Sequence, residues 1–351
     1  MNILLMGYYG FHNVGNDLFL RQLIDYFAQK QDIKKIFVFC QEDYYERTTD
    51  KVRFFAANKL SKLKRLVIIL QSHCLMWGGG TLNIGDKPTN LLRLQSISKW
   101  TNKRFCFLGV GLEAINSDEK ENKSQVFQNP DLLYLRDKQS YESALQKLNP
   151  IKACCLGGDL EFLDLNYYQS YIKERKSTEI KNISFSGKFW CGEGRGENYG
   201  QQIMHFVEKY NSTIHLLPAH VGEERNDNKF HHLLKKYLPE SNYKLHSWEK
   251  PIEFVEILSE MDLHFGNRLH SVILADILGI PSVGISGPNT KIQHYIDKTE
   301  MLPELRLLDF MEPIELHNIE KLFREYQRPN EFILNESKTA KEGVELVFKA
   351  N

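Results

Sequence analysis

The chain lacks several features that would assign it to a common functional class. Its 351 residues include 45 Lys+Arg and 45 Asp+Glu, so no net charge favours nucleic acid or an anionic membrane surface as a partner. Local basic residues can still form an anion site. The six cysteines include no CxxC pair, which disfavours a metal site and indicates small buried side chains in a reducing compartment. We therefore expect no metal and no cofactor.

Long hydrophobic runs are also missing. The longest aliphatic run, LVIIL at 66–70, is far too short to span a bilayer. The apolar run before Gly7 is only five residues long and no basic segment precedes it, so it predicts a strand and not a signal peptide. These absences predict a cytoplasmic protein.

Short apolar segments instead alternate with longer amphipathic ones along the chain. Strands are predicted at 2–6, 35–39, 52–56, 73–77, 104–110, 132–136, 152–156, 182–186, 213–219, 243–247, 262–266 and 281–286. Helices in the second half are predicted at 197–210, 226–238, 251–260, 269–278 and 290–298. Such alternation is typical of parallel strands joined by crossover helices. The expected fold class is α/β, with two doubly wound Rossmann-like domains whose mostly parallel sheets face a cleft.

The polar, tyrosine-rich stretch at 166–182 is the best linker candidate. It suggests an N-terminal domain at 1–168 and a C-terminal domain at 180–316. The remaining helical segment, 317–351, could pack back on the N-terminal domain. Because ligands of such sheets bind outside the carboxyl ends of the strands, the loops after the strands are the places to look for a site.

Two glycine-rich loops follow strands of the first half. GYYGFHNVGND at 7–17 has the spacing of neither a dinucleotide fingerprint nor a Walker loop, and a tight turn with Asn16 or Asp17 as helix cap is an alternative explanation. WGGGTLNIGD at 77–86 has three successive glycines, which cost backbone entropy and therefore indicate close approach of a ligand or of another backbone. Asn83 and Asp86 are the side chains best placed to act beside that loop.

The sharpest signal is HFGNRLHSVILADILGIPSVGIS at 264–286. Arg268 and His270 stand where a strand gives way to an apolar helix, whose N–H groups and dipole favour an anion. Arginine adds a bidentate clamp for phosphate or carboxylate, and histidine is a general acid or base near neutral pH. A histidine at a helix start is often structural, so the prediction of a site here depends on Arg268 and His270 occurring together beside Gly266 at the end of a strand. Other strand ends of this half add Lys188, Arg195 and His220.

These segments, taken in order, resemble a known family. GYYGFHNVGND, WGGGTLN, GVG, RDKQS, GGD and GNRLHSVILADILGIPSVGIS are similar to the polysaccharide pyruvyl transferases over about residues 1–300. The resemblance implies a GT-B-like architecture and transfer of a pyruvyl group from phosphoenolpyruvate to two sugar hydroxyls, giving a cyclic ketal and phosphate. It matches the family's R-L-H motif to Arg268 and His270, and its acidic residue loosely to Asp86. Ser186 stands where the family often has arginine, and Lys188 or Arg195 could substitute for it.

The combined prediction gives each candidate residue a role. His270 and Asp86 are expected to be catalytic, and Arg268, Lys188, Arg195 and His220 to bind phosphoenolpyruvate. The expected acceptor site consists of Tyr9, His12, Asn16, Asp17, Gly79, Gly80 and Asn83. The expected acceptor is a glycan precursor, lipid-linked or nucleotide-linked, which could bring the enzyme to the inner face of the membrane. No nucleic acid partner is expected.

Two other functions remain open at this point. A GT-B glycosyltransferase with a nucleotide-sugar donor would use the same apolar helix, with Asp276 near the place of its ribose-binding acid. A non-catalytic glycan-binding subunit would instead use aromatic side chains that stack on sugars, for which the candidates are Tyr8, Tyr9, Trp77, Trp190 and Trp248.

Overall fold

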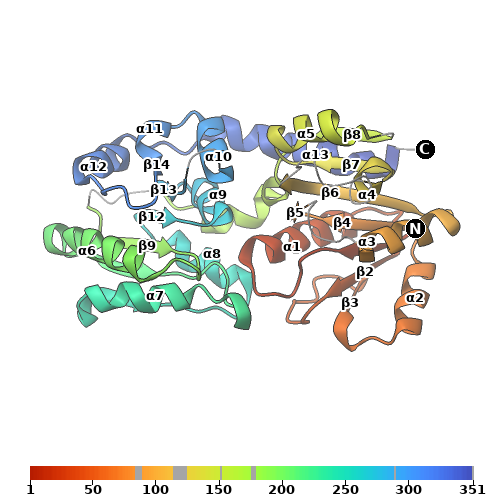
Figure 1. Ribbon diagram of the computed structural model, residues 1–351, viewed down its shortest axis with the longest axis horizontal. Coiled ribbons are helices and arrows are strands. Elements are labelled where there is room, and N and C mark those ends of the chain that lie inside the picture. Colours follow the sequence, from red (N-terminus) through yellow and green to blue (C-terminus); the bar gives the residue numbers. More distant parts are fainter. Residues whose placement is uncertain (84–88, 114–124, 151, 175–178, 288–289, 350–351) are drawn as a thin grey trace. The chain divides into compact units, whose positions relative to one another are not determined.

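A computed structural model of the chain describes residues 1–83, 89–113, 125–150, 152–174, 179–287 and 290–349 (Figure 1). Contacts divide it into two compact units. Unit 1 comprises Met1–Phe11, Asn16–Asp164 and Leu334–Asn351, and unit 2 comprises His12–Gly15 and Leu165–Ile333. The predicted helical segment 317–351 is therefore shared between the units.

Unit 1 is built on a parallel sheet in the order β3-β2-β1-β4-β6-β7-β8, with β5 paired to β6. Each crossover joins strands that run in the same direction, as the alternating sequence predicts. Its strands are β1 (Asn2–Met6), β2 (Lys35–Cys40), β3 (Val52–Ala56), β4 (Cys74–Gly78), β5 (Thr81–Asn83), β6 (Arg104–Glu113), β7 (Leu132–Leu135) and β8 (Ala153–Leu156). Its helices before β8 are α1 (Val14–Ala28), α2 (Lys62–Gln71), α3 (Thr89–Trp100), α4 (Gln125–Gln128) and α5 (Lys138–Ser143).

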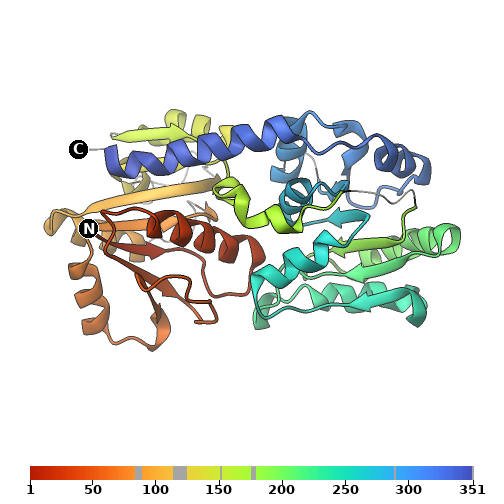
Figure 2. The ribbon, with the colours of Figure 1, turned by 180° about the vertical axis from the view of Figure 1, so that it is seen from behind.

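Both faces of this sheet are covered, because successive strand residues point to opposite sides. Ile3 and Leu5 of β1 belong to one apolar cluster, whereas Leu4 and Met6 belong to another. The first cluster contains α1 and the last helix, α13 (Asn330–Lys349). Figure 2 shows α13 running along the sheet, and the Tyr26 hydroxyl of α1 donates to Glu345 of α13. The end of the chain thus completes the core of unit 1.

Unit 2 has a parallel sheet in the order β11-β10-β9-β12-β13-β14. Its strands are β9 (Asn182–Ser186), β10 (Thr213–Leu216), β11 (Tyr243–Leu245), β12 (Leu263–Gly266), β13 (Ser282–Ile285) and β14 (Leu307–Leu308). Its helices are α6 (Glu193–Tyr210), α7 (Asn228–Leu234), α8 (Pro251–Ser259), α9 (Leu269–Leu278), α10 (Lys291–Thr299), α11 (Pro303–Arg306) and α12 (Leu316–Glu325).

The tip of the first glycine loop is part of unit 2. Asn13 forms an isolated antiparallel bridge with His220. On either side, Val14 N donates to Ala219 O at 3.0 Å and Val221 N donates to His12 O at 3.0 Å. These backbone bonds attach His12, Asn13 and the start of α1 to the segment after β10, a pairing that was not predicted from the sequence.

The predicted fold class is confirmed, with two α/β units on parallel sheets. Helix α9 occupies the predicted 269–278, ending at Gly279 with φ +79°, a left-handed conformation that favours glycine. The predictions missed β5 and β14, because strands of three and two residues are too short to show an apolar pattern.

Candidate functional site

The candidate site of unit 2 lies where its strand order reverses. β9 is the first strand of the unit, with β10 on one side and β12 on the other, so the carboxyl ends of β9 and β12 form a topological switch point. Ligands of doubly wound sheets bind outside the strands at such points. The loop after β12 supplies Asn267 and Arg268, and the loop after β9 supplies residues 187–192.

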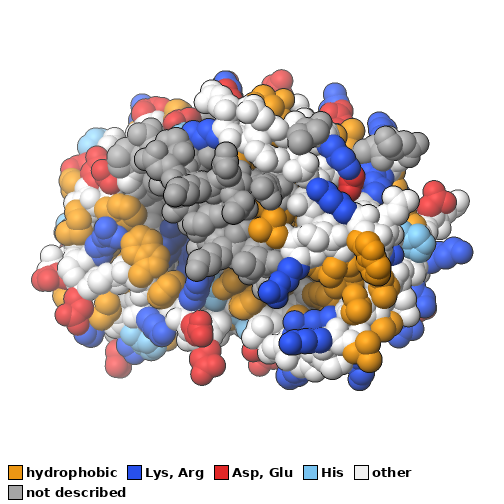
Figure 3. Space-filling view, turned by 45° about the vertical axis from the view of Figure 1, so that its right-hand side comes forward, with side chains coloured by type: hydrophobic (Ala, Val, Ile, Leu, Met, Phe, Trp, Pro, Cys, Tyr) orange, Lys and Arg blue, Asp and Glu red, His pale blue; other side chains and the backbone are white. Residues whose placement is uncertain are grey.

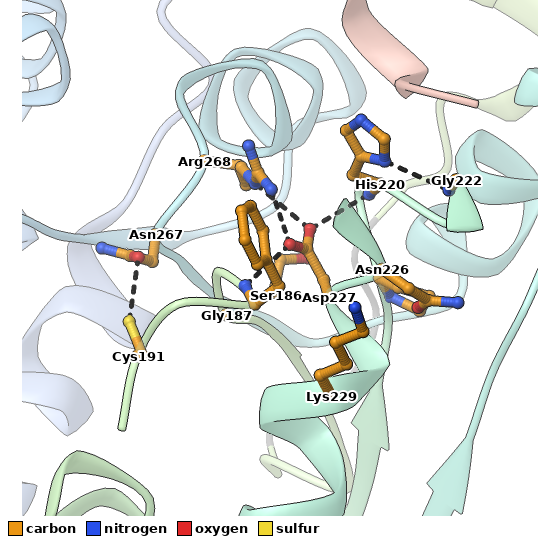
Figure 4. A network of polar contacts seen from close by, with 12 residues as sticks. Ser186, Gly187, Cys191, His220, Gly222, Asn226, Asp227, Lys229, Asn267 and Arg268 are labelled. Carbon is orange, nitrogen blue, oxygen red and sulfur yellow. Dashed lines mark hydrogen bonds and ion pairs between the residues drawn. The ribbon is translucent and has the colours of Figure 1, made fainter. Parts of the chain in front are cut away.

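A buried ion pair dominates this point (Figure 4). The Arg268 guanidinium donates from Nε to Asp227 Oδ2 at 3.1 Å and from Nη2 to Asp227 Oδ1 at 2.6 Å. The Asp227 side chain is fully buried, whereas that of Arg268 is 20% exposed. A bidentate pair fixes the plane of the guanidinium as well as its position. Arg268 therefore presents its outer edge in one orientation.

Asp227 also ties together the loops around Arg268. Its carboxylate accepts hydrogen bonds from Phe189 N and from His220 N, both at 3.0 Å, so it joins the loops after β9, β10 and β12. Burial raises the pKa of Asp227, while the Arg268 charge and the two amides act in the opposite direction. Because four donors converge on it, we take the carboxylate as ionised at neutral pH.

Arg268 is also the N-cap residue of α9. The first N–H groups of that helix have no partner within the helix, and its dipole adds partial positive charge at this end. Asp227 engages Nε and Nη2 of Arg268, and no described residue bonds its Nη1. Helix and guanidinium together form a place suited to a phosphate or carboxylate.

His270 lies in the first turn of α9, half-buried, and its ring packs against Gly15. A Cβ on Gly15 would approach His270 Nδ1 to 2.2 Å, closer than any side chain tolerates. The glycine is thus required because the imidazole occupies the space that a side chain would need. The last glycine of the opening loop therefore serves to place His270.

His220 is a buried, neutral donor. Its Nδ1 accepts from Gly222 N at 3.1 Å, so the proton of the neutral ring is on Nε2, which is buried and has no partner among the described residues. Burial lowers the pKa of His220 to about 3, with help from the positive charges of Arg268 and Arg225. Figure 4 shows the ring pointing away from Asp227. An unsatisfied buried N–H calls for an explanation, and a ligand oxygen would satisfy it.

Lys188 and Arg195 gather on the Trp190 ring. Lys188 Nζ lies 5.2 Å from the Trp190 ring centroid, and Arg195 Cζ lies 5.7 Å from it. Arg195 also stacks on Phe310, with Cζ at 4.0 Å from the ring centroid. Trp190 is 51% exposed, so the cluster lies at the surface of the β9–α6 loop. It combines an aromatic face with positive charge.

Ser186, at the position where the family often has arginine, has a structural role. It is fully buried, and its hydroxyl donates to Leu217 O at 2.6 Å. This bond joins the ends of β9 and β10. The positive charges near the end of β9 are therefore those of Lys188 and Arg195.

Two of the expected acceptor residues of the opening loop, Tyr9 and Asp17, are buried in unit 1. Tyr9 is fully buried, and its hydroxyl donates to Gly78 O at 2.6 Å. Burial raises the pKa of that hydroxyl, and the nearby Asp17 carboxylate acts in the same direction. Asp17 is also fully buried and accepts from Gly10 N at 3.1 Å and from the hydroxyls of Tyr44 and Tyr45. Tyr9 and Asp17 thus support the loop from inside unit 1.

His12 lies in unit 2 and has a left-handed backbone, with φ of 54°. Its ring centroid is 6.1 Å from that of Trp248, and its charge acts on the pKa of His220. The structure therefore brings His12 and His220 together, which the sequence placed in different halves of the site.

The triple-glycine loop is shaped by α1. Gly79 and Gly80 have φ of +68° and +78°. A Cβ on Gly79 would meet Phe19 at 2.3 Å, and one on Gly80 would lie 3.2 Å from Asn16 Oδ1. Asn16 and Gly80 are thus neighbours in unit 1. Asn83 belongs to β5, and Asp86 lies outside the described residues.

Asp276 does not occupy a ligand site. It is fully buried in α9, and its carboxylate accepts from Arg306 Nη2 at 2.7 and 2.8 Å and from the hydroxyls of Tyr295 and Tyr326, each at 2.9 Å. The interpretation of Asp276 as a ribose-binding acid is wrong, because its oxygens are used inside the core. The nucleotide-sugar alternative therefore lacks Asp276 as a ribose-binding acid.

Asp227 is a site residue that was not predicted from the sequence. It lies within the segment predicted as the helix 226–238, and the observed α7 begins one residue later, with Asp227 as its N-cap. An acidic residue at a helix start usually caps the helix, but the Asp227 side chain makes no capping bond to α7. Nothing in the spacing showed that its carboxylate reaches the arginine 41 positions later.

Comparison with known proteins identifies the relatives of this arrangement. A family model described as polysaccharide pyruvyl transferase matches residues 13–289. No curated protein sequence matches the chain.

Solved structures share its fold at low identity. UDP-GlcNAc 2-epimerase from Neisseria meningitidis, bound to UDP-GlcNAc, is 14% identical with a TM-score of 0.58, and covers 100% of this chain and 99% of its own. The corresponding epimerase from Rickettsia bellii is 10% identical, with a TM-score of 0.63 and coverages of 99% and 96%. The lipopolysaccharide outer core galactosyltransferase WaaB is 11% identical, with a TM-score of 0.52 and complete coverage of both chains. These likenesses establish the GT-B fold.

Proposed function

The chain belongs to the polysaccharide pyruvyl transferase family, whose members are transferases, and we propose that it moves a pyruvyl group from phosphoenolpyruvate onto two hydroxyls of a sugar. The acceptor is a polysaccharide or cell-surface glycan precursor and the product is a ketal. The observation that carries this proposal is Arg268, held by buried Asp227 at the start of α9. That arrangement suits an anionic donor and explains why the positive side chain has one orientation.

Phosphoenolpyruvate has two anionic groups, a phosphate and a carboxylate. In the proposed site Arg268 and the α9 N-terminus bind one of them, because a rigid fork and free N–H groups match its oxygens. The His220 ring, which its low pKa keeps neutral, donates a hydrogen bond from Nε2 to an oxygen of phosphoenolpyruvate in this proposal. Lys188, in the loop that Asp227 ties to Arg268 through Phe189 N, and Arg195, in the first turn of α6, supply further positive charge.

The proposed reaction makes two C–O bonds and breaks one. One sugar hydroxyl adds to the central carbon of phosphoenolpyruvate and gives its proton to a base, while an acid delivers a proton to the methylene carbon. The C–O bond to phosphate then breaks, and the second hydroxyl adds to the same carbon and gives its proton to the released phosphate or to a base. His270 is the proposed general acid and base, next to the donor clamp in sequence and ordered by Gly15. Asp86, which lies outside the described residues, is the second proposed catalytic residue.

The proposed acceptor site uses the glycine loops. Gly79 and Gly80 let a sugar approach the backbone, and Asn16, beside Gly80, offers an amide for its hydroxyls. Asn83 completes the proposed contacts of unit 1. Tyr9 and Asp17 contribute indirectly in this proposal, because both are buried and hold the loop in shape.

The test is a balance of products. The purified protein is incubated with phosphoenolpyruvate and a panel of glycan precursors, and phosphate release is compared with ketal formation by NMR. One phosphate per ketal, with both lost in Arg268→Ala, is the expected result. Failure of every class of glycan acceptor to give a ketal, with a folded enzyme, would refute the donor assignment.

A further inference from the structure

Helix α2 of unit 1 carries an exposed apolar stripe. Leu63, Leu66, Val67 and Leu70 are 71%, 38%, 43% and 44% exposed, respectively. Their spacing of three and four residues places them on one face of the helix. The opposite face holds Ile68 and Ile69, the residues of α2 that are buried against the sheet. The helix is thus anchored on one side and apolar on the other.

Basic side chains surround this stripe. Lys59, Lys62 and Lys64 are exposed, and Arg65 donates to Ala57 O. The sequence from 57 to 73 contains no Asp or Glu. Figure 3 shows Lys and Arg side chains bordering a hydrophobic patch on this face of the molecule. An apolar stripe flanked by lysines is the pattern of helices that lie in a lipid–water interface.

Trp100, the last residue of α3, is a further exposed apolar side chain. It is 84% exposed, the most exposed of the large hydrophobic residues described. Three residues later, Lys103 Nζ donates to Leu70 O at 2.7 Å, so the segment after α3 is tied to the last turn of α2. Tryptophan is enriched at membrane interfaces, where its ring is apolar and its N–H reaches water.

We propose that α2, together with Trp100, docks the protein on the surface of an anionic phospholipid bilayer. We favour a bilayer over a protein partner because of charge. Lysines around an apolar stripe complement lipid phosphates, whereas they would add no affinity for an apolar protein groove. The described helices include none that is long and apolar enough to cross a membrane. Membrane docking by α2 does not depend on the proposed pyruvyl transfer. A lipid-linked acceptor would be located in the same membrane.

Vesicle flotation of the full chain tests the proposal. The probes are vesicles of phosphatidylcholine alone and of phosphatidylcholine mixed with phosphatidylglycerol. Leu63→Glu removes one exposed leucine of the stripe, and Leu334→Glu, on α13 with 64% exposure, is the matched control. We expect wild type and Leu334→Glu to float with the anionic vesicles, and Leu63→Glu to lose roughly tenfold in partitioning. Replacing Lys62 and Lys64 by Gln is expected to cost about fivefold for each charge.

Two further readouts separate the possible outcomes. Vesicle binding should shift the tryptophan emission to shorter wavelength, and Trp100→Phe should remove most of that shift. Absence of wild-type binding to anionic vesicles, or binding that Leu63→Glu leaves unchanged, overturns the proposal. So does a dimer in sedimentation velocity that Leu63→Glu dissociates, because the stripe would then be an interface between two copies of this chain.

Discussion

The two units place different chemistry at equivalent points of similar sheets. In each, the first strand lies between its second and fourth major strands, so each has a switch point. At that of unit 1, glycines line the loops, and the acid, Asp17, is enclosed by tyrosine hydroxyls. At that of unit 2, the acid, Asp227, orients an arginine that stays partly exposed. The same topology thus forms a passive surface in one unit and a charged site in the other.

The largest expected effect is on catalysis, and it should distinguish the Arg268–Asp227 pair of unit 2 from the Arg47–Asp43 pair of unit 1. Arg268→Lys loses the planar fork, so we expect kcat/KM for phosphoenolpyruvate to fall about 100-fold or more, measured by phosphate release. The matched control is Arg47→Lys, since Arg47 also forms a bidentate pair, with Asp43 in unit 1 at 2.8 and 2.6 Å. Equal losses in the two variants would contradict a special role for unit 2.

Acid should destabilise unit 2 before unit 1. Burial lowers the pKa of His231 and His264 to about 3 from 6.5, and both are fully buried in unit 2. Because the unfolded chain then binds protons first, the stability they contribute is complete above pH 6.5 and is lost as pH falls from 6.5 towards 3. At pH 5 this amounts to about 2 kcal/mol for each histidine.

Hydrogen exchange at pH 7 and pH 5 measures this effect, and we expect faster exchange in unit 2 at the lower pH. His264→Gln should reduce the pH dependence of Tm, whereas His317→Gln, at an exposed side chain, should leave it unchanged. Uniform loss of protection across both units would argue against the assignment.

A smaller effect should come from one methyl group. Gly15→Ala places a Cβ against the His270 ring, so the imidazole must move, and we expect kcat to drop about tenfold. Gly192→Ala is the control, because nothing lies within 4 Å of its added Cβ. If both variants keep wild-type kcat at unchanged stability, the orientation of His270 does not matter for the reaction.

The smallest catalytic effect is expected in unit 1. Asp17→Asn weakens the bonds from Gly10 N and the two tyrosines, so we expect about 1 kcal/mol lower free energy of unfolding. The KM for phosphoenolpyruvate should not change, because the donor is assigned to unit 2. A large rise in that KM would return the first glycine loop to the role of phosphate cradle.

Most of the architecture could be predicted from periodicity, because parallel strands buried on both faces read as short apolar runs. Arg268 and His270 could be predicted as site residues because the sequence shows where the apolar helix begins, and helix N-termini bind anions. The partners of these residues could not be found: Asp227 and Gly15 meet them only through the fold, and no spacing rule joins positions so far apart. The exposed stripe of α2 could not be predicted in this way, because its LVIIL run reads as a short apolar segment and its lysines are balanced by acids elsewhere in the chain.

A crystal structure with phosphoenolpyruvate tests the central claim most directly. We expect one anionic group of phosphoenolpyruvate within hydrogen-bond distance of Arg268 Nη1 and the α9 N-terminus, and one of its oxygens at His220 Nε2. Binding at the glycine loops of unit 1, with Arg268 and His220 left without contacts to the donor, would contradict it.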